Sequence, residues 1–180
     1  MKVLIVGLAI TVLYAGFLVF QADHNRFIIK QEELKALANE CSGAAAIYYE
    51  KNAYKDGYKV FDISEGNKAI GFLIRENLKL DEEFNPLGGA YWVDTIDYYV
   101  HYYDDSGLMS AYHRDSLTET GSFSYGDLYV DPVEDYMKVI SEPTVIVTII
   151  AGRPRYRLTF FEAFEITAAR SSAYEYVSRD

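Results

Sequence analysis

The residue types that most often carry chemistry are few and scattered in this chain of 180 residues. The three histidines, His24, His101 and His113, have no metal-ligand spacing with one another or with Cys41, the only cysteine. A catalytic thiol at Cys41 would need a base and a positively charged setting, and neither is visible nearby in the sequence. We therefore expect Cys41 to be a small buried residue of a helix, with a reactive thiol as the alternative.

The acidic residues also lack the spacing of a catalytic or metal site. Asp94 and Asp97 are three residues apart on an expected strand, so their side chains point to opposite faces. Asp104 and Asp105 lack the length and the later glutamate of an EF-hand loop, although a weak surface calcium site there is the alternative. No serine-centred elbow, phosphate loop or dinucleotide fingerprint occurs. We expect no active site, no metal and no cofactor, so the chain is not predicted to be an enzyme.

The feature that dominates the sequence is an unbroken apolar run at residues 3–20, VLIVGLAITVLYAGFLVF. As a helix, 18 residues reach about 27 Å, close to the ~30 Å of a bilayer's hydrocarbon core. Lys2 and the amino terminus favour the cytoplasmic side, which leaves residues 21–180 outside. A cleaved signal peptide is the alternative, but the run is longer than the usual 7–15-residue core and Phe20 poorly fits a cleavage site.

The rest of the chain is strongly acidic. The formal net charge is −10, and all 27 acids but only 16 of the 17 Lys and Arg residues lie beyond Phe20, so this part carries about −11. Such a charge disfavours nucleic acid and anionic lipid surfaces as partners and suits a solvated surface domain.

Helical periodicity continues after the apolar run. Residues recur at spacings of three and four along one apolar stripe, and no proline interrupts the chain before Pro86. The pattern predicts one helix over 2–52, followed by a second over about 64–78 that begins with Asp62 as N-cap and Glu65 three residues later. The stripe consists of Leu34, Leu37, Cys41, Ala44 and Tyr48.

The remaining chain has the patterns of a mainly antiparallel sheet. Trp92, Ile96, Tyr98, Val100 and Tyr102 share one face of a half-buried strand, and Asp104–Gly107 is a hairpin turn. The patterns predict a return strand at 108–114, a weak strand at 121–130, a short helix from Asp131 to about Ile140, a central strand at 144–150 and two further strands at 155–160 and 164–177. The expected fold class is α+β: a long N-terminal hydrophobic-then-amphipathic helix packed on a mainly antiparallel β-sheet.

The order of these parts resembles type IV pilins and the Tad-type pseudopilins. The resemblance rests on residues 3–50, VLIVGLAITVLYAGFLVFQADHNRFIIKQEELKALANECSGAAAIYY, followed by a strand-rich half. It implies a pilin-like fold and a subunit that polymerises through its N-terminal helix. Two features depart from the family pattern: no leader ending in glycine is visible, and Ile5 stands where typical type IV pilins carry a glutamate.

A pilin-like helix pulled into water must bury its apolar side chains against identical helices. Small residues at Thr11 and Ala15, and at Ala9 and Gly16, would give close-approach faces, with ordinary membrane-helix composition as the alternative. The residues expected to form the filament core are Val3, Leu4, Ile5, Gly7, Ala9, Thr11, Ala15, Gly16 and Phe20.

Charged residues of the outer domain are expected to meet between subunits. One subunit's acidic region would face a neighbour's basic hairpin, and two independently solvated faces are the alternative. The acidic residues are Asp94, Asp97, Asp104 and Asp105, and the basic ones are Arg153, Arg155 and Arg157.

These observations predict three parts: a transmembrane or filament-core segment at 1–22, the amphipathic half of the same helix at 23–52, and an extracellular domain at 53–180. The expected function is a pilin-like structural subunit of a cell-surface filament, membrane-inserted with its N-terminus inside before assembly. Its partners would be itself, the membrane and a pilus-type assembly machinery, with no nucleic acid. The alternative is a non-polymerising membrane-anchored accessory protein (a pseudopilin) or sensor domain. The 17 tyrosines suit strand packing, or else adhesion through exposed rings.

Overall fold

The structure is a computed structural model that describes residues 2–133, 135–158 and 168–175. Its helices are α1 (Lys2–Ala46), α2 (Lys51–Lys55) and α3 (Ile63–Leu78). Its strands are β1 (Asp97–Tyr103), β2 (Leu108–His113), β3 (Ser116–Ser122), β4 (Leu128–Val130), β5 (Met137–Val139), β6 (Thr144–Gly152) and β7 (Ala168–Glu175). This is the α+β fold class that the sequence predicts.

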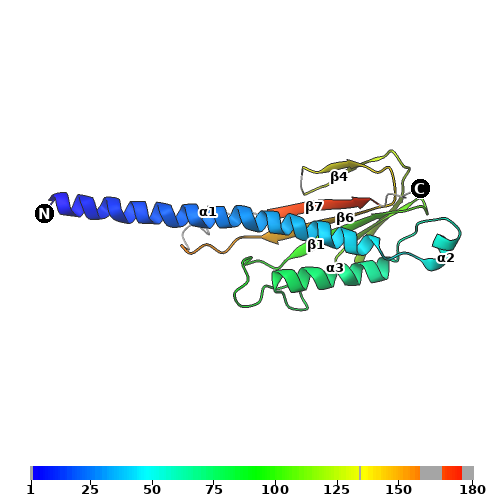
Figure 1. Cartoon of the computed structure of the whole chain (residues 1–180), viewed down its shortest axis with the longest axis horizontal. Coiled ribbons are helices and arrows are strands. Elements are labelled where there is room, and N and C mark those ends of the chain that lie inside the picture. Colours follow the sequence, from blue (N-terminus) through cyan, green and yellow to red (C-terminus); the bar gives the residue numbers. More distant parts are fainter. Residues whose placement is uncertain (1, 134, 159–167, 176–180) are drawn as a thin grey trace.

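Helix α1 is continuous over 45 residues and has two different environments. Its N-terminal half extends beyond the domain, and its C-terminal half lies along the sheet (Figure 1). The buried residues of α1 begin at Asp23 and Phe27 and include Leu34, Leu37 and Cys41 of the predicted stripe. Ala44 is only half-buried and Tyr48 is exposed. The apolar half of α1 therefore contributes nothing to the core of the domain.

The helix ends at Ala46, six residues before the predicted end at 52. Residues 48–50 pair instead with residues 60–62, because Glu50 N–H donates to the Val60 carbonyl and Asp62 N–H donates to the Tyr48 carbonyl. These hydrogen bonds compete with continuation of the helix. The periodicity of the sequence gives no information about them, because their partners lie in another segment. A short separate helix, α2, follows within the resulting loop.

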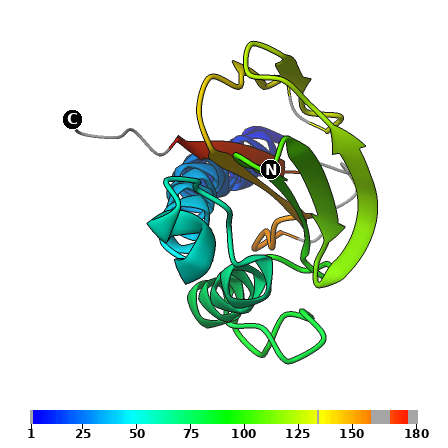
Figure 2. The ribbon, with the colours of Figure 1, turned by 90° about the vertical axis from the view of Figure 1, so that its right-hand side faces the viewer.

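The main sheet has five strands in the order β3-β2-β1-β6-β7, and all its pairs are antiparallel. Strand β6 lies between β1 and β7, as expected for the predicted central strand at 144–150. Helices α1 and α3 lie side by side on one face of the sheet (Figure 2). The predicted inward face of β1 is buried there, including Tyr98, Val100 and Tyr102. The core of the domain thus lies between the two helices and the sheet.

Helix α3 approaches the sheet closely because two of its residues lack side chains. A Cβ at Gly66 would lie 2.8 Å from the Tyr102 hydroxyl, and one at Gly71 would lie 3.4 Å from the Tyr98 hydroxyl. The Tyr102 hydroxyl donates to Asn67 Oδ1 at 2.8 Å. The predicted N-cap is present, since the Asp62 carboxylate accepts a hydrogen bond from Glu65 N–H at 3.2 Å.

A two-stranded ribbon of β4 and β5 covers the other face of the sheet. Tyr129 and Ile140 from the ribbon region pack there against Tyr103 and Ile146. The predicted helix over 131–140 is therefore wrong. Asp131 does accept from Val133 N–H, as an N-cap would, but its carboxylate also accepts from Tyr129 and Thr148, and the chain reverses into β5. The same local signal begins a helix or an Asx turn, and tertiary contacts decide between them.

Two other strand predictions are also wrong in part. The weak strand at 121–130 is divided between β3 and β4, separated by a turn in which Ser124 N–H donates to Asp127. The predicted strand at 155–160 is absent over 155–158, because Arg155 N–H donates to Tyr91 and Arg157 N–H donates to Asp23 instead of to a neighbouring strand. Its last two residues, and part of the predicted strand at 164–177, lie outside the described residues, while β7 occupies 168–175.

Candidate assembly helix and its junction with the domain

The projecting half of α1 has an apolar surface that the domain leaves largely uncovered. None of its most apolar 18-residue window is buried, and its large exposed side chains range from 86% exposed at Val3 to 36% at Phe20, while Gly16 and Val19 are partly exposed. All the predicted filament-core residues lie on this half: Val3, Leu4, Ile5, Gly7, Ala9, Thr11, Ala15, Gly16 and Phe20. In the described part of the chain, α1 is the one helix whose length and composition allow it to act as a membrane anchor or a signal sequence.

Small residues leave open space along this half of α1. A Cβ placed at Gly7 or Gly16 would meet nothing within 4 Å. Thr11 Oγ1 donates to the Gly7 carbonyl at 2.9 Å, so this hydroxyl is satisfied within the helix and can enter an apolar environment at little cost. Gly7, Thr11 and Ala15 recur at spacings of four, so they lie on one side of the helix.

The junction between the projecting half and the domain is an ion pair. Asp23 is only 2% exposed, and its two carboxylate oxygens accept from Arg157 N–H and Nε–H, both at 2.9 Å. The segment that contains Arg157 follows β6 and runs back beside α1 (Figure 1). Arg157 is among the charged residues predicted from the sequence, whereas Asp23 is not. The available signal was an acid four residues before Phe27, on the buried side of the helix.

The two predicted charge groups meet within one chain at one point. Asp94 accepts from the Arg153 guanidinium, with Nη2 2.6 Å from Oδ1, and from Arg153 N–H at 2.8 Å. These hydrogen bonds hold the pKa of Asp94 below its ordinary value. Arg155 is exposed and has no acidic partner among the residues that the structure describes.

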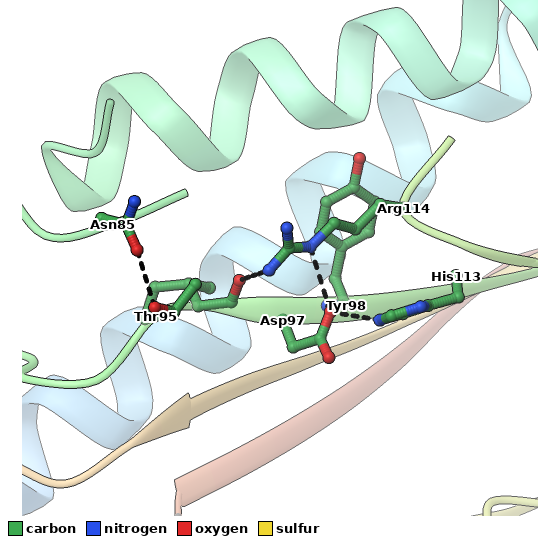
Figure 3. A network of polar contacts seen from close by, with 7 residues as sticks. Asn85, Thr95, Asp97, Tyr98, His113 and Arg114 are labelled. Atoms are coloured by element: carbon green, nitrogen blue, oxygen red, sulfur yellow. Dashed lines mark hydrogen bonds and ion pairs between the residues drawn. The ribbon is translucent and has the colours of Figure 1, made fainter. Parts of the chain in front are cut away.

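Asp97 also has partners inside the chain (Figure 3). Its Oδ1 lies 2.6 Å from His113 Nε2 and 3.2 Å from Arg114 Nε, while Arg114 Nη2 donates to the Ile96 carbonyl. These contacts tie the beginning of β1 to the end of β2. We therefore assign Asp97 a role within the domain, and its use between subunits stays a prediction.

Asp104 and Asp105 fasten the hairpin turn to the loop before α3. Asp104 is buried and accepts from Phe61 N–H at 3.1 Å, and Asp105 accepts from Lys59 N–H at 2.7 Å. Asp105 also accepts from the Tyr125 hydroxyl at 2.5 Å. The register pairs Asp97 with Ile150 and Tyr103 with Thr144, so this acidic turn and the 153–157 arginine segment lie at opposite ends of the sheet.

The histidines and the cysteine do not form a reactive group. Cys41 is fully buried, and burial raises the pKa of its thiol to about 12. His101 lies beside Tyr129, and burial lowers its pKa below the ordinary value. In the described ranges, no three His, Cys, Asp or Glu side chains come together in a way that could hold a metal ion.

Several tyrosines are buried in the core, and a second group is exposed at one end of the domain, while Tyr14 is exposed on the projecting half of α1. Tyr98, Tyr102 and Tyr103 of β1 are buried, so their rings are not available for adhesion. Exposed tyrosines gather around α2, at the end of the domain far from the N-terminus (Figure 1): Tyr48, Tyr49, Tyr54, Tyr58 and Tyr125.

No family model, no curated protein and no solved structure matches this chain. Functional inference for this protein therefore depends on its own geometry, above all on the uncovered apolar half of α1 and its junction with the domain.

Proposed function

We propose that this protein is a pilin-like structural subunit, anchored in a membrane by residues 3–20 before assembly, that polymerises through the projecting half of α1 into a cell-surface filament. The observation that carries the proposal is the apolar half of a helix, none of whose most apolar window is buried, joined to another half that is built into the domain core.

The exposed apolar surface requires a cover. Burial of each large aliphatic or aromatic side chain is favourable by about 1.5–3 kcal/mol relative to its exposure to water. Lipid supplies that cover while the helix is in a bilayer, and neighbouring copies of the same helix supply it outside. Small residues at Gly7, Thr11 and Ala15 permit close approach of the backbones.

The continuity of α1 supports assembly more strongly than simple anchoring. A tether needs only a flexible connection, whereas here one helix passes from the projecting half into the core without a break. The Asp23–Arg157 pair fixes the domain at a set height on that helix. Packing of the helices would therefore also set the positions of the domains.

The charged ends of the domain fit a head-to-tail arrangement. Asp105 of the acidic turn, which is partly exposed, and the segment with Arg155 and Arg157 lie at opposite ends of the sheet. Stacked subunits would bring one end toward the other. Filament yield after Arg155→Glu tests this contact, because assembly that is unchanged by the charge reversal would remove it from the proposal.

The deciding experiment is electron microscopy of material sheared from cells that express the chain, with mass spectrometry of the filaments. We expect filaments composed of this protein. Gly16→Leu should reduce them by removing open space on the helix, whereas the volume-conserving Leu18→Ile should not. Protein that stays entirely in the membrane fraction without filaments would instead support the anchored accessory or sensor protein.

Orientation in the membrane needs its own test. Lys2 favours an N-terminus inside, whereas Arg26, Lys30 and Lys35 follow the apolar run on the domain side. We propose the N-in orientation and test it with Lys55→Cys, an exposed site on α2, and a membrane-impermeant maleimide on intact cells. Buried Cys41, with its raised pKa, serves as the internal unreactive thiol. Labelling only after lysis would contradict the orientation.

A further inference from the structure

The end of the domain from which α1 projects carries a group of cations around one aromatic side chain. The Arg26 guanidinium carbon lies 5.2 Å from the centre of the Tyr91 ring, and the Tyr91 carbonyl accepts from Arg155 N–H at 2.8 Å. Arg157 lies beside the same part of α1 through its pair with Asp23. Arg26, Arg155 and Arg157 are called the basal arginines below.

The basal arginines have donors that remain available. Arg26 and Arg155 are exposed, and neither has an acidic partner in the part of the chain that the structure describes. Arg157 uses its Nε–H on Asp23, but its side chain is 59% exposed. Arg153 differs, because its guanidinium is engaged by both oxygens of Asp94.

A shallow hollow beside Tyr91 extends this cationic character. Arg26, Lys30 and Lys79 line it, together with the small residues Gly89 and Ala90. Glu33 is the acid among its lining residues, and it is already paired with Lys30. The acidic residues 81–83 follow Lys79 in the chain but do not line the hollow.

Measured along α1, the residues that carry or hold two of the basal arginines begin within the headgroup layer of a bilayer and extend just beyond it. Asp23, which holds Arg157, lies about 4.5 Å beyond Phe20 along the helix axis, and Arg26 about 9 Å beyond it. The headgroup region is about 5–7.5 Å thick on each side of the hydrocarbon core. Side chains of a helix tilt toward its N-terminus, which allows a long side chain such as that of Arg26 to reach back into this layer.

We propose that the basal arginines dock the domain on the phosphate groups of anionic phospholipids in the membrane that holds residues 3–20. This inference rests on the membrane-anchored state of the proposed function and not on filament formation. Guanidinium groups suit it because they form paired hydrogen bonds with phosphate oxygens.

The overall charge of −10 does not oppose this docking. Exposed charges more than about 10 Å apart are largely screened at an ionic strength of 0.1 M, so the local group of arginines determines the contact. The expectation from total charge, which disfavoured anionic lipid surfaces, does not take this segregation into account.

The test uses the full chain in detergent micelles that contain equal amounts of phosphatidylglycerol and phosphatidylcholine, with retained lipids counted by native mass spectrometry. We expect the protein to retain phosphatidylglycerol in preference. Each exposed arginine should contribute about fivefold, so Arg26→Gln combined with Arg155→Gln should lower retention about 25-fold. The control, Lys51→Gln combined with Lys55→Gln, removes two charges at the far end and should retain the preference.

Three results would overturn the inference: equal retention of both lipids, an unchanged preference in the arginine variant, or an equal loss in the lysine control. Displacement of phosphatidylglycerol by inorganic phosphate at the same concentration would also overturn it, because the site would then bind free phosphate. If the double variant does not fold, the same comparison is made with Arg26→Gln and Arg155→Gln as single variants. Filaments without a lipid preference would overturn only this inference, and a lipid preference without filaments would support it while contradicting polymerisation.

Discussion

Asp23 is the first residue along α1 that is buried against the domain. A carboxylate that is 2% exposed needs hydrogen-bond donors, and Asp23 receives them from a residue 134 positions away in the chain. Its oxygens accept from a backbone N–H and a guanidinium, a charge-assisted arrangement stronger than a neutral hydrogen bond. Asp23 therefore holds the segment that contains Arg157 against α1, at the end of the domain nearest the apolar half.

We predict that Asp23→Ala destabilises the domain, because Arg157 N–H loses its acceptor in a partly buried place. The free energy of unfolding should fall by about 2 kcal/mol, which corresponds to a lower Tm by about 4–8 °C. Thermal unfolding of the full chain in detergent, followed by circular dichroism, measures the change.

The matched control for Asp23 is Glu32→Ala, an exposed acid on the same helix. Its effect should stay within about 0.5 kcal/mol. Equal effects of the two substitutions would mean that the buried pair contributes no more than a surface charge.

At the scale of elements, the packing of α3 on β1 depends on a missing side chain. Gly66 lies directly over the Tyr102 hydroxyl, whose ring is buried and whose oxygen is held by Asn67. Glycine at this position lowers helix stability by about 1 kcal/mol relative to alanine. Its missing side chain allows α3 to lie close to the sheet.

We predict opposite effects for two glycine substitutions on this helix. Gly66→Ala should lower the free energy of unfolding, because its Cβ would lie 2.8 Å from a hydroxyl that cannot move freely. Gly71→Ala should be neutral or stabilise by up to about 1 kcal/mol, because its Cβ would make an ordinary contact at 3.4 Å. Urea unfolding of both variants tests the pair, and equal stabilisation by both would contradict the close packing.

Local signals explain which elements the sequence predicted correctly. The Asp62 cap and the alternation along β1 act within a few residues, so α3 and the buried face of β1 could be found from pattern alone. The end of α1 and residues 155–158 depend on hydrogen bonds to residues outside their own segments, and the position of the β4–β5 ribbon depends on packing against β1 and β6. The same limit applies to the candidate site: composition reveals the apolar half of α1, but not the pairing of Asp23 with Arg157.

At the scale of the whole molecule, buried phenols make stability depend on alkaline pH. Burial raises the pKa of Tyr91 and Tyr103 to about 12, and it also raises that of Tyr98, Tyr102 and Tyr129 above the ordinary value of 10.0. These phenols remain protonated in the folded state at a pH where the unfolded chain loses its protons.

We predict that the free energy of unfolding falls as pH rises above about 10, because the unfolded state then binds fewer protons than the folded state. Urea unfolding between pH 8 and pH 11.5 measures the slope. Tyr98→Phe should reduce the slope at little cost in stability, because the Tyr98 hydroxyl is buried and has no hydrogen-bond partner among the residues that the structure describes. A stability that is unchanged up to pH 11.5 would contradict the prediction.

The position of α1 along one face of the sheet also determines how the molecule responds to tension. A pull on the projecting half acts along the helix axis, and that axis runs beside β6 and β7 (Figure 1). The contacts between helix and sheet are then loaded in shear, so many must break together instead of one after another. We therefore expect high rupture forces in single-molecule pulling between the N-terminus and the sheet, which the proposed filament subunit would need in order to transmit force along a fibre.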